Sequence, residues 1–576
     1  MNTFSLCLVL IIFLIDLNVI SSQSVSVGGD VKPNTLVIAF LVRNKAHTLP
    51  YFLTLLENLN YPKQRIKLWI QSDHNVDNSI EILDAWLSKV SSSYSSINTH
   101  FAPSPPTEFK DEEGPTHWSE SRFTHIMRLR EEALMYSRET WADYLLFIDC
   151  DVFLTYPDVI QDMVSKNYPL VSPVLQSSGL YSNFWGGMTS DFYYYRSDDY
   201  ESILFRKEKG CFKVPMIHSC VFIDLRYQST DKLSYLPEKV PGYHGPHDDI
   251  ITFALAANLS GIPLHVCNEN THGFVMVPLE RDTPLESDES QLTNIKLEVL
   301  LTGPPLSVSE SLSRFVKKSE KTSWGLSRTY LINLERRPER RKRMMDCFDV
   351  LGLEVTVLNA VDGSLLDETE LTRRGVQFLP GYRDPYHKRP MTKGEIGCFL
   401  SHFRIWKEIV EENLDVVMVL EDDVRFEHYF KSKLEQVLDE LRTLPDFDWD
   451  FVYLGRKRLL QNVTEDQVIG SEFLRHVSYS YWTIGYLISL SGAQKLLAAK
   501  PLNNLLPVDE FLPIMYNQQP QESWAQYYPE RNLLAYVAEP LLLYPALYVN
   551  EPGYVSDTEN STTIKVTQTT ERREEL

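Results

Sequence analysis

Short runs of consecutive apolar residues alternate along the chain with longer stretches in which apolar residues recur every three or four positions. The first pattern predicts β-strands covered on both faces, and the second predicts amphipathic α-helices. The clearest strand is at 416–420, and three carboxylates follow it directly: Glu421, Asp422 and Asp423. Strands that alternate with helices indicate βαβ units and a mainly parallel sheet.

The carboxylates after residues 416–420 stand where a ligand is expected. Ligands of open α/β sheets bind in the crevice at the carboxyl ends of the strands. Three adjacent anions repel one another, whereas Mg²⁺ or Mn²⁺ prefers carboxylate oxygens and is often shared with substrate phosphates. We therefore predict a divalent cation at this turn. A solvated acidic turn is the alternative.

The first half of the chain shows the same alternation. Strands are expected at 36–41, 66–70 and 144–148, and helices at 49–59, 80–90 and 121–137. Asp149 and Asp151 follow the third strand, and alternate side chains of an extended chain share a face. The two carboxylates are therefore predicted to hold one cation together. Later, His247, Asp248 and Asp249 supply either a further ligand or base, or only a helix N-terminus favoured by the dipole.

The pattern restarts with a strand at 328–334 that opens the second half. A basic run from Glu335 to Arg341 follows, and basic residues at a strand-to-helix junction suit a diphosphate. A solvated basic face is the alternative. The helix at 394–412 carries Ser401 and His402 within its apolar stripe.

Two helix starts are expected near the end of the second half. Residues 491–494 have the spacing of a capping box. Asp509 and Glu510 follow Pro507 at the other predicted start. Carboxylates there either complement the helix dipole or serve as a general base.

This plan predicts an α/β fold with two tandem domains of the nucleotide-sugar-binding, Rossmann-like kind, each with a mainly parallel sheet flanked by helices. The domains are expected at 33–281 and 327–556. A charged linker rich in Ser and Pro separates them at 282–326, with short helices at 297–301 and 312–316. A polar tail occupies 557–576.

The chain has 576 residues, with 56 Lys and Arg against 78 Asp and Glu, and its net charge is −22. This balance argues against nucleic acid as a partner, which requires a basic surface. Six cysteines follow Cys7, and Cys211 with Cys220 is the most plausible local pair in an oxidising compartment. Three sequons, at Asn258, Asn462 and Asn560, fit the secretory pathway.

Residues 1–22 predict a signal peptide, because the apolar run at 4–15 is shorter than a membrane span. An uncleaved anchor is the alternative. The chain ends Arg573-Glu-Glu-Leu576, a variant of the Lys-Asp-Glu-Leu signal that a retrieval receptor reads. We therefore expect a protein of the endoplasmic reticulum lumen with no membrane span after signal removal. A homodimer is left open.

Four blocks of the second half resemble glycosyltransferase family 25. They are Ile332-Asn-Leu-Glu-Arg-Arg-Pro-Glu-Arg-Arg341, Thr392-Lys-Gly-Glu-Ile-Gly-Cys-Phe-Leu-Ser-His402, Leu420-Glu-Asp-Asp-Val424 and Pro507-Val-Asp-Glu-Phe-Leu512. With Asp149-Cys-Asp151 in front and the retrieval-type end behind, residues 33 to 576 resemble the collagen-modifying members of that family. The resemblance implies GT-A-type folds, a Mn²⁺ requirement, and inverting transfer of galactose from UDP-galactose to hydroxylysine of procollagen chains.

The resemblance and the chemistry together suggest a role for each candidate residue. The expected metal ligands are Glu421 and Asp423 in the second half, and Asp149 and Asp151 in the first. The residues expected to contact uridine and diphosphate are Asn333, Arg336 and Arg340, and the candidates for facing the ligand are Ser401 and His402. Asp422 is expected to hold a ribose or shape the turn.

The expected general base is Asp509, with Glu510 as the near alternative.

Three other hypotheses stay open. The chain could be a catalytically silent adhesion or chaperone-like member of the family. Its first half could catalyse while the second supports, or each half could transfer one sugar. Intact carboxylates in both halves argue against the silent alternative.

Overall fold

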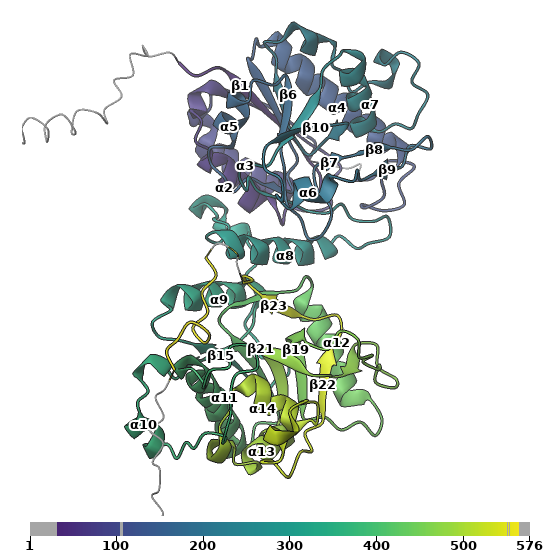
Figure 1. Ribbon diagram of the computed structural model, residues 1–576. Helices are drawn as coiled ribbons and strands as arrows, with labels where there is room; N and C mark the ends of the chain where they lie inside the picture. Colours follow the sequence, from purple (N-terminus) through teal and green to yellow (C-terminus); the bar gives the residue numbers. More distant parts are fainter. Residues whose placement is uncertain (1–31, 104–106, 550, 552, 564–576) are drawn as a thin grey trace, which may run out of the picture.

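The computed structural model shows two lobes joined by a helix that lies between them (Figure 1). It describes residues 32–103, 107–549, 551 and 553–563. The predicted signal peptide and the retrieval-type end at 573–576 lie outside the described residues. Each lobe has a central sheet flanked by helices, which confirms the predicted two-domain α/β fold.

The N-terminal domain is built on an eight-stranded sheet. In spatial order its strands are β10 (Cys211–Val214), β13 (Leu264–Cys267), β6 (Leu170–Pro173), β12 (Cys220–Asp224), β4 (Tyr144–Ile148), β1 (Leu36–Val42), β2 (Ile66–Ser72) and β3 (Ser96–Phe101). All but β10 and β12 run in one direction. The carboxyl ends of the other strands therefore meet at one edge, as in other open α/β sheets.

Helices cover both faces of this sheet. They are α2 (Leu49–Asn58), α3 (Ser79–Val90), α4 (Glu120–Glu139), α5 (Val159–Ser165), α6 (Tyr200–Leu204) and α7 (Asp249–Leu259). Alternate residues of β1 enter two separate cores: Ile38 packs with residues of α2 and α3, and Val37 with residues of α4 and α7. Burial on both faces explains why the strand has no polar positions. Short ladders complete the domain: β5 (Val152–Phe153) with β14 (Phe274–Val275), β7 (Phe184–Trp185) with β11 (Met216–Ile217), and β8 (Gly187–Met188) with β9 (Tyr194–Tyr195).

The C-terminal domain has a seven-stranded sheet. Its spatial order is β16 (Thr356–Asn359), β15 (Arg328–Asn333), β17 (Val416–Glu421), β21 (Ser480–Ser489), β19 (Phe451–Arg458), β22 (Ala535–Ala538) and β20 (Leu474–His476). Its helices are α9 (Pro338–Leu351), α10 (Glu368–Arg373), α11 (Lys393–Glu412), α12 (Phe430–Thr443), α13 (Leu490–Ala498), α14 (Val508–Met515) and α15 (Glu522–Ala525).

Side-chain caps mark where α10, α11 and α13 of the second domain begin. Thr392 and Glu395 form a capping box at the start of α11, which satisfies backbone N–H groups that have no partner within the helix. The expected capping box at Ser491 is wrong. Ser489 caps α13 instead, because its side chain accepts from the Gly492 N–H.

The two sheets share one topology. Strands β2, β1, β4, β12, β6, β13 and β10 match β16, β15, β17, β21, β19, β22 and β20 in spatial order, in chain order and in direction. The short strand after β4 pairs antiparallel with β14, just as β18 (Val424–Phe426) pairs with β23 (Leu543–Pro545). Asp149 and Asp151 therefore occupy the same topological position as Glu421 and Asp423.

The region expected to be a linker contains helix α8 (Ser287–Thr302), which lies between the lobes in Figure 1. Leu292 and Ile295 pack with Phe153 and Phe274 of the first domain, whereas Leu297 and Leu300 enter the core of the second. A helix buried on two sides has no single apolar stripe, which is why its periodicity is weak in the sequence.

The expected disulfide between Cys211 and Cys220 is wrong. Cys211 is bonded to Cys267, because the antiparallel register of β10 and β13 places these residues opposite each other. Cys220 lies on β12 as a buried free thiol.

Within the described residues, no helix combines the length and the apolar character needed to cross a bilayer.

Candidate functional site

Three carboxylates mark the end of β17, at the edge of the sheet where the carboxyl ends of β15, β16 and β17 meet. Glu421 is the last residue of the strand, and Asp422 and Asp423 form the turn into β18. The structure gives each carboxylate a different environment.

Glu421 is held by side chains from two neighbouring elements. Its Oε1 accepts a hydrogen bond of 2.6 Å from Thr483 on β21 and lies 3.3 Å from His402 Nε2 on α11. Nδ1 of His402 is 2.9 Å from the Tyr486 hydroxyl. Burial alone would raise the pKa of Glu421, but its contacts with His402 and Thr483 keep that pKa below its ordinary value. Cys398, His402 and Glu421 lie close enough together to share one ion.

Asp422 is turned toward the protein. Its carboxylate accepts from Asn333 Nδ2 at 2.6 Å and from Arg340 Nη1 at 3.2 Å. Asn333 also donates to the Arg337 carbonyl, so it ties the end of β15 to this turn. These contacts fit a role for Asp422 in shaping the turn.

Asp423 is the least compensated of the three. Its Oδ1 is buried and has no hydrogen-bond partner among the described residues, and Arg340 Nη1 lies 3.5 Å from its Oδ2. Burial first, and then the charges of Glu421 and Asp422, raise the pKa of Asp423. An unpartnered oxygen beside a second carboxylate fits a hard divalent cation, which takes carboxylate oxygens.

Asp509 and Glu510 begin α14 and differ in their surroundings. Asp509 accepts one hydrogen bond, 3.1 Å from the Trp482 N–H. Burial, followed by the charges of Glu421 and Glu510, raises the pKa of Asp509 to about 8. Glu510 is buried and accepts from Tyr479, Tyr481 and Gln519. Asp509 therefore has fewer hydrogen-bond donors than Glu510 and is the less constrained of the two carboxylates.

Two residues expected to contact the ligand, Arg336 and Ser401, bond to other parts of the protein instead. Arg336 bonds to Asp362 at 2.9 Å and to Asp557 at 2.7 Å, and Arg337 also pairs with Asp557. Ser401 donates to the Gly397 carbonyl and accepts from the Val361 N–H. Of the expected basic contacts, only Arg340 reaches the carboxylates.

Sequence reasoning missed Thr483 and Arg343. Arg343 Nη2 donates to the carbonyl of Asp422 and Nη1 to that of Val424, which fixes the turn. Arg343 follows Arg340 on the same helix, α9, so the basic run itself was a signal for it. Nothing local to β21 marked Thr483.

Asp149 and Asp151 at the end of β4 are each paired with a cation of the protein. Arg130 on α4 bonds to Asp149 at 2.9 Å and to Asp249 at 2.8 Å, and Lys45 bonds to Asp151 at 2.9 Å. They line a cavity of about 420 Å³. Metal binding by Asp149 and Asp151 stays a prediction.

The cluster at 247–249 is the start of α7. Asp248 is its N-cap and accepts from the N–H groups of Ile250 and Ile251. His247 Nδ1 contacts Thr124 at 2.5 Å. Helix α7 lies between β12 and β13 in the chain, as α14 lies between β21 and β22.

Two family profiles match the chain. One, described as glycosyltransferase family 25, N-terminal domain, matches residues 32–296. The other, described as glycosyltransferase family 25 (LPS biosynthesis protein), matches residues 326–512.

Several curated relatives cover nearly the whole chain. A glycosyltransferase 25 family member of Aedes aegypti is 51% identical over 545 residues, which are 94% of this chain and 89% of the relative. Procollagen galactosyltransferase 2 of Mus musculus is 46% identical, with 92% and 84% covered. Procollagen galactosyltransferase 1 of Danio rerio is 43% identical, with 91% of this chain and 86% of the relative covered.

Among solved structures, S. aureus TarS 1-349 in complex with UDP-GlcNAc is 11% identical and covers 49% of this chain and 71% of its own. Its TM-score of 0.28 is too low to support any inference. The matches to the family profiles and curated relatives show that the chain belongs to glycosyltransferase family 25.

Proposed function

We propose that this protein is a metal-dependent, inverting galactosyltransferase that moves galactose from UDP-galactose to hydroxylysine of procollagen. The names of the relatives from Mus musculus and Danio rerio support the sugar and the acceptor. The same names support the secretory pathway as the location, and we extend the proposal to the endoplasmic reticulum lumen. The sequon residues Asn258, Asn462 and Asn560 are exposed, as glycosylation requires.

One observation supports assigning the sugar transfer to the C-terminal domain. Asp423 has a buried oxygen without a partner among the described residues, and the pKa of both Asp423 and Asp509 is raised. A site with this much uncompensated negative charge is suited to a bound cation. In the N-terminal domain Lys45 and Arg130 pair with Asp151 and Asp149 at 2.9 Å, whereas Arg340 approaches Asp423 at 3.5 Å; burial also raises the pKa of Asp249 in the first domain.

Each residue then has a role. Glu421 and Asp423 would hold Mn²⁺, which when bound stabilises the charge of a leaving diphosphate as a Lewis acid. Arg340, 3.2 Å from Asp422, would contact the same diphosphate. Asp509 takes the proton of the acceptor hydroxyl. The hydroxyl oxygen bonds to the anomeric carbon of galactose as the bond between that carbon and UDP breaks. Burial and the charge of Glu421 raise the pKa of Asp509, and a cation bound by Glu421 would lower it and leave the carboxylate ionised to accept the proton.

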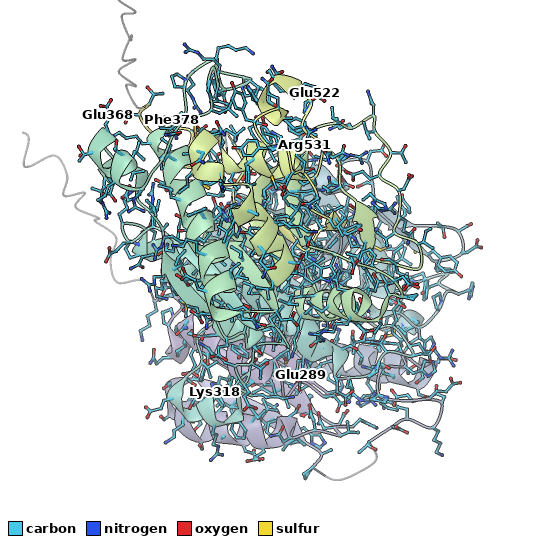
Figure 2. All side chains as sticks on the ribbon, turned by 90° about the horizontal axis from the view of Figure 1, so that it is seen from below. Glu289, Lys318, Glu368, Phe378, Glu522 and Arg531 are labelled. Atoms are coloured by element: carbon cyan, nitrogen blue, oxygen red, sulfur yellow. A yellow bond between two sulfur atoms is a disulfide. The ribbon has the colours of Figure 1, made fainter. Side chains whose placement is uncertain are left out.

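Galactose transfer to a hydroxylysine peptide tests the proposal. With purified full-length protein and UDP-galactose, Glu421→Ala/Asp423→Ala should lose transfer, and EDTA should abolish transfer by the unaltered protein until Mn²⁺ is restored. Glu522→Ala, an exposed carboxylate change in the same domain, is the matched control (Figure 2). Full transfer by the double variant, or in EDTA, would refute the site. Loss of transfer in Asp149→Ala/Asp151→Ala with unchanged melting would move the chemistry to the first domain.

A further inference from the structure

The acceptor of the proposed reaction carries a positive charge beside its reacting oxygen. In hydroxylysine the hydroxyl group and the ammonium group are on adjacent carbon atoms. When the hydroxyl oxygen lies at Asp509 to give up its proton, the ammonium nitrogen must therefore lie close by. A site that binds this side chain needs a place for a cation next to its base, because a charge removed from water without a partner is costly.

Tyrosine side chains border the two carboxylates at the start of α14. Tyr481 donates a hydrogen bond to Glu510, and the next residue, Trp482, donates its N–H to Asp509 at 3.1 Å. The ring of Tyr386 meets that of Tyr481 edge-on, with centroids 6.1 Å apart and planes at 80°. Tyr386 is 63% exposed. It therefore presents an aromatic surface to solvent one ring away from the carboxylate pair.

Negative charge is concentrated around the ring of Tyr386. Burial, and then the charges of Glu510 and Asp384, raise the pKa of its phenol. The Asp384 carboxylate accepts from the backbone N–H groups of Tyr386 and His387, which fixes it beside the ring. Glu510 is buried, whereas Asp384 is partly exposed and can be reached by a ligand.

The cations of the same loop do not pair with Asp384. Lys388 Nζ donates to the Pro385 carbonyl at 2.6 Å, and Arg389 forms an ion pair with Glu395 at 2.9 Å. Among the described residues, no lysine, arginine or histidine side chain forms an ion pair with Asp384. An aromatic face attracts an ammonium group through its quadrupole, and a carboxylate beside it adds the attraction of its charge.

Building on the proposed function, we propose that Tyr386 and Asp384 form a subsite for the ammonium group of the acceptor side chain, and that this subsite restricts transfer to hydroxyl groups next to an amine. The ring supplies a face for the cation, and the carboxylate supplies its counter-charge. The hydroxyl groups of serine, threonine and hydroxyproline have no such cation beside them. The site therefore selects its acceptor by charge as well as by the hydroxyl group.

Calorimetric titration of the full chain with acceptor peptides, in the absence of donor, tests the subsite. The probes are a peptide that contains hydroxylysine and the same peptide acetylated on the side-chain amine. We expect acetylation to weaken binding by about fivefold or more, and Tyr386→Ala to weaken binding of the free amine by about the same factor. Binding of the acetylated peptide should not change in Tyr386→Ala.

Two further variants separate the role of the ring from a general effect on the fold. Tyr386→Phe keeps the aromatic face and should bind both peptides like the parent. Tyr193→Ala removes a tyrosine of the first domain that is 74% exposed and is the matched control. Should Tyr386→Ala fail to fold in thermal melts, Asp384→Asn takes its place with the same expectation. In transfer assays Tyr386→Ala should raise KM for the peptide and leave KM for UDP-galactose unchanged.

Equal binding of the two peptides, equal weakening of both by Tyr386→Ala, or no binding of the free amine at millimolar concentration would overturn the proposal. The titration contains no donor, so it reads the subsite independently of transfer. Selective binding of the free amine without galactose transfer would refute the proposed function and leave the subsite standing. Transfer that does not distinguish the two peptides would do the reverse.

Discussion

At the scale of single residues, the neighbouring carboxylates Asp509 and Glu510 have different hydrogen-bonding surroundings, although both stand at the same predicted helix start. The Glu510 carboxylate accepts hydrogen bonds from Tyr479, Tyr481 and Gln519. Among the described residues, Asp509 has a single hydrogen-bond donor, the Trp482 N–H. Burial without a full set of donors leaves Asp509 with the raised pKa of a base.

We therefore expect Asp509→Asn to reduce the turnover number by about 10² to 10⁴-fold, the usual contribution of a general base. Its melting temperature should stay near that of the parent. Glu510→Gln should instead lower the free energy of unfolding by roughly 1 to 3 kcal/mol, because a buried donor loses its acceptor. Transfer kinetics and thermal melts on both variants check this. The assignment is reversed if Glu510→Gln melts normally but does not turn over.

The buried ion pair between Arg456 and Glu465 predicts that the free energy of unfolding depends on pH. Burial alone would raise the pKa of Glu465, but Arg456 and Ser478 hold it at about 2, against an ordinary value of 4.5. Because the folded pKa is the lower one, the stabilisation is complete above pH 5 and is lost as pH falls from about 4.5 to 2.

Glu465→Gln should therefore cost roughly 2 to 3 kcal/mol of unfolding free energy near pH 7, and the difference should shrink toward pH 2. Urea unfolding between pH 3 and pH 7 measures it, with the exposed Glu354→Gln as control. A difference independent of pH would show that Glu465 is not ionised in the fold.

At the scale of elements, the segment 553–563 packs on the basic start of α9 and on α11. Asp557 bonds to Arg336 and Arg337, and the Val555 carbonyl accepts from Arg340. The sequence suggested only a polar tail here. Pairing with an internal carboxylate keeps the guanidinium groups ordered in the absence of a phosphate.

If Arg336 and Arg337 also meet the diphosphate, Asp557 competes with it. We expect Asp557→Ala to lower KM for UDP-galactose by about two- to fivefold, which corresponds to a partly exposed ion pair. Steady-state kinetics at low and high salt check this, with the exposed Glu530→Ala as control. A raised KM would mean that Asp557 positions the arginines for the donor.

At the scale of the whole molecule, α8 connects the two domains. Asp288 near its start faces Lys45, whereas Glu298 near its end accepts from Arg425 and His428, just beyond the carboxylates of β17. Its apolar residues enter both cores. The helix therefore links the two domains.

Glu298→Ala should weaken this link, because it leaves Arg425 and His428 without their shared carboxylate. We expect calorimetric unfolding to shift down by about 2 to 6 °C, as a loss of one to two kcal/mol would produce in domains of this size, and to separate into two transitions. Glu289→Ala, an exposed site on the same helix labelled in Figure 2, should leave the melt unchanged. An unchanged melt for Glu298→Ala would mean that apolar contacts alone hold the domains together.

The sequence by itself determined the strands with their terminal carboxylates, since continuous hydrophobicity and local spacing are properties of neighbouring residues. Residues 144–148 form a strand as expected, the strand expected at 328–334 covers 328–333, and α11 begins within one residue of its expected start. Only residues 297–301 of the weakly periodic α8 were expected to be helical, and the short edge strands were missed, because their burial depends on distant partners.

Only the tertiary structure decided which carboxylates are compensated. Lys45 reaches Asp151 across 106 positions of the chain, and Cys267 meets Cys211 across 56. Asp423 has a buried oxygen that no described residue partners, although its sequence surroundings resemble those of Asp151. Charge compensation depends on distances in space between residues far apart in the chain, and local pattern does not encode those distances.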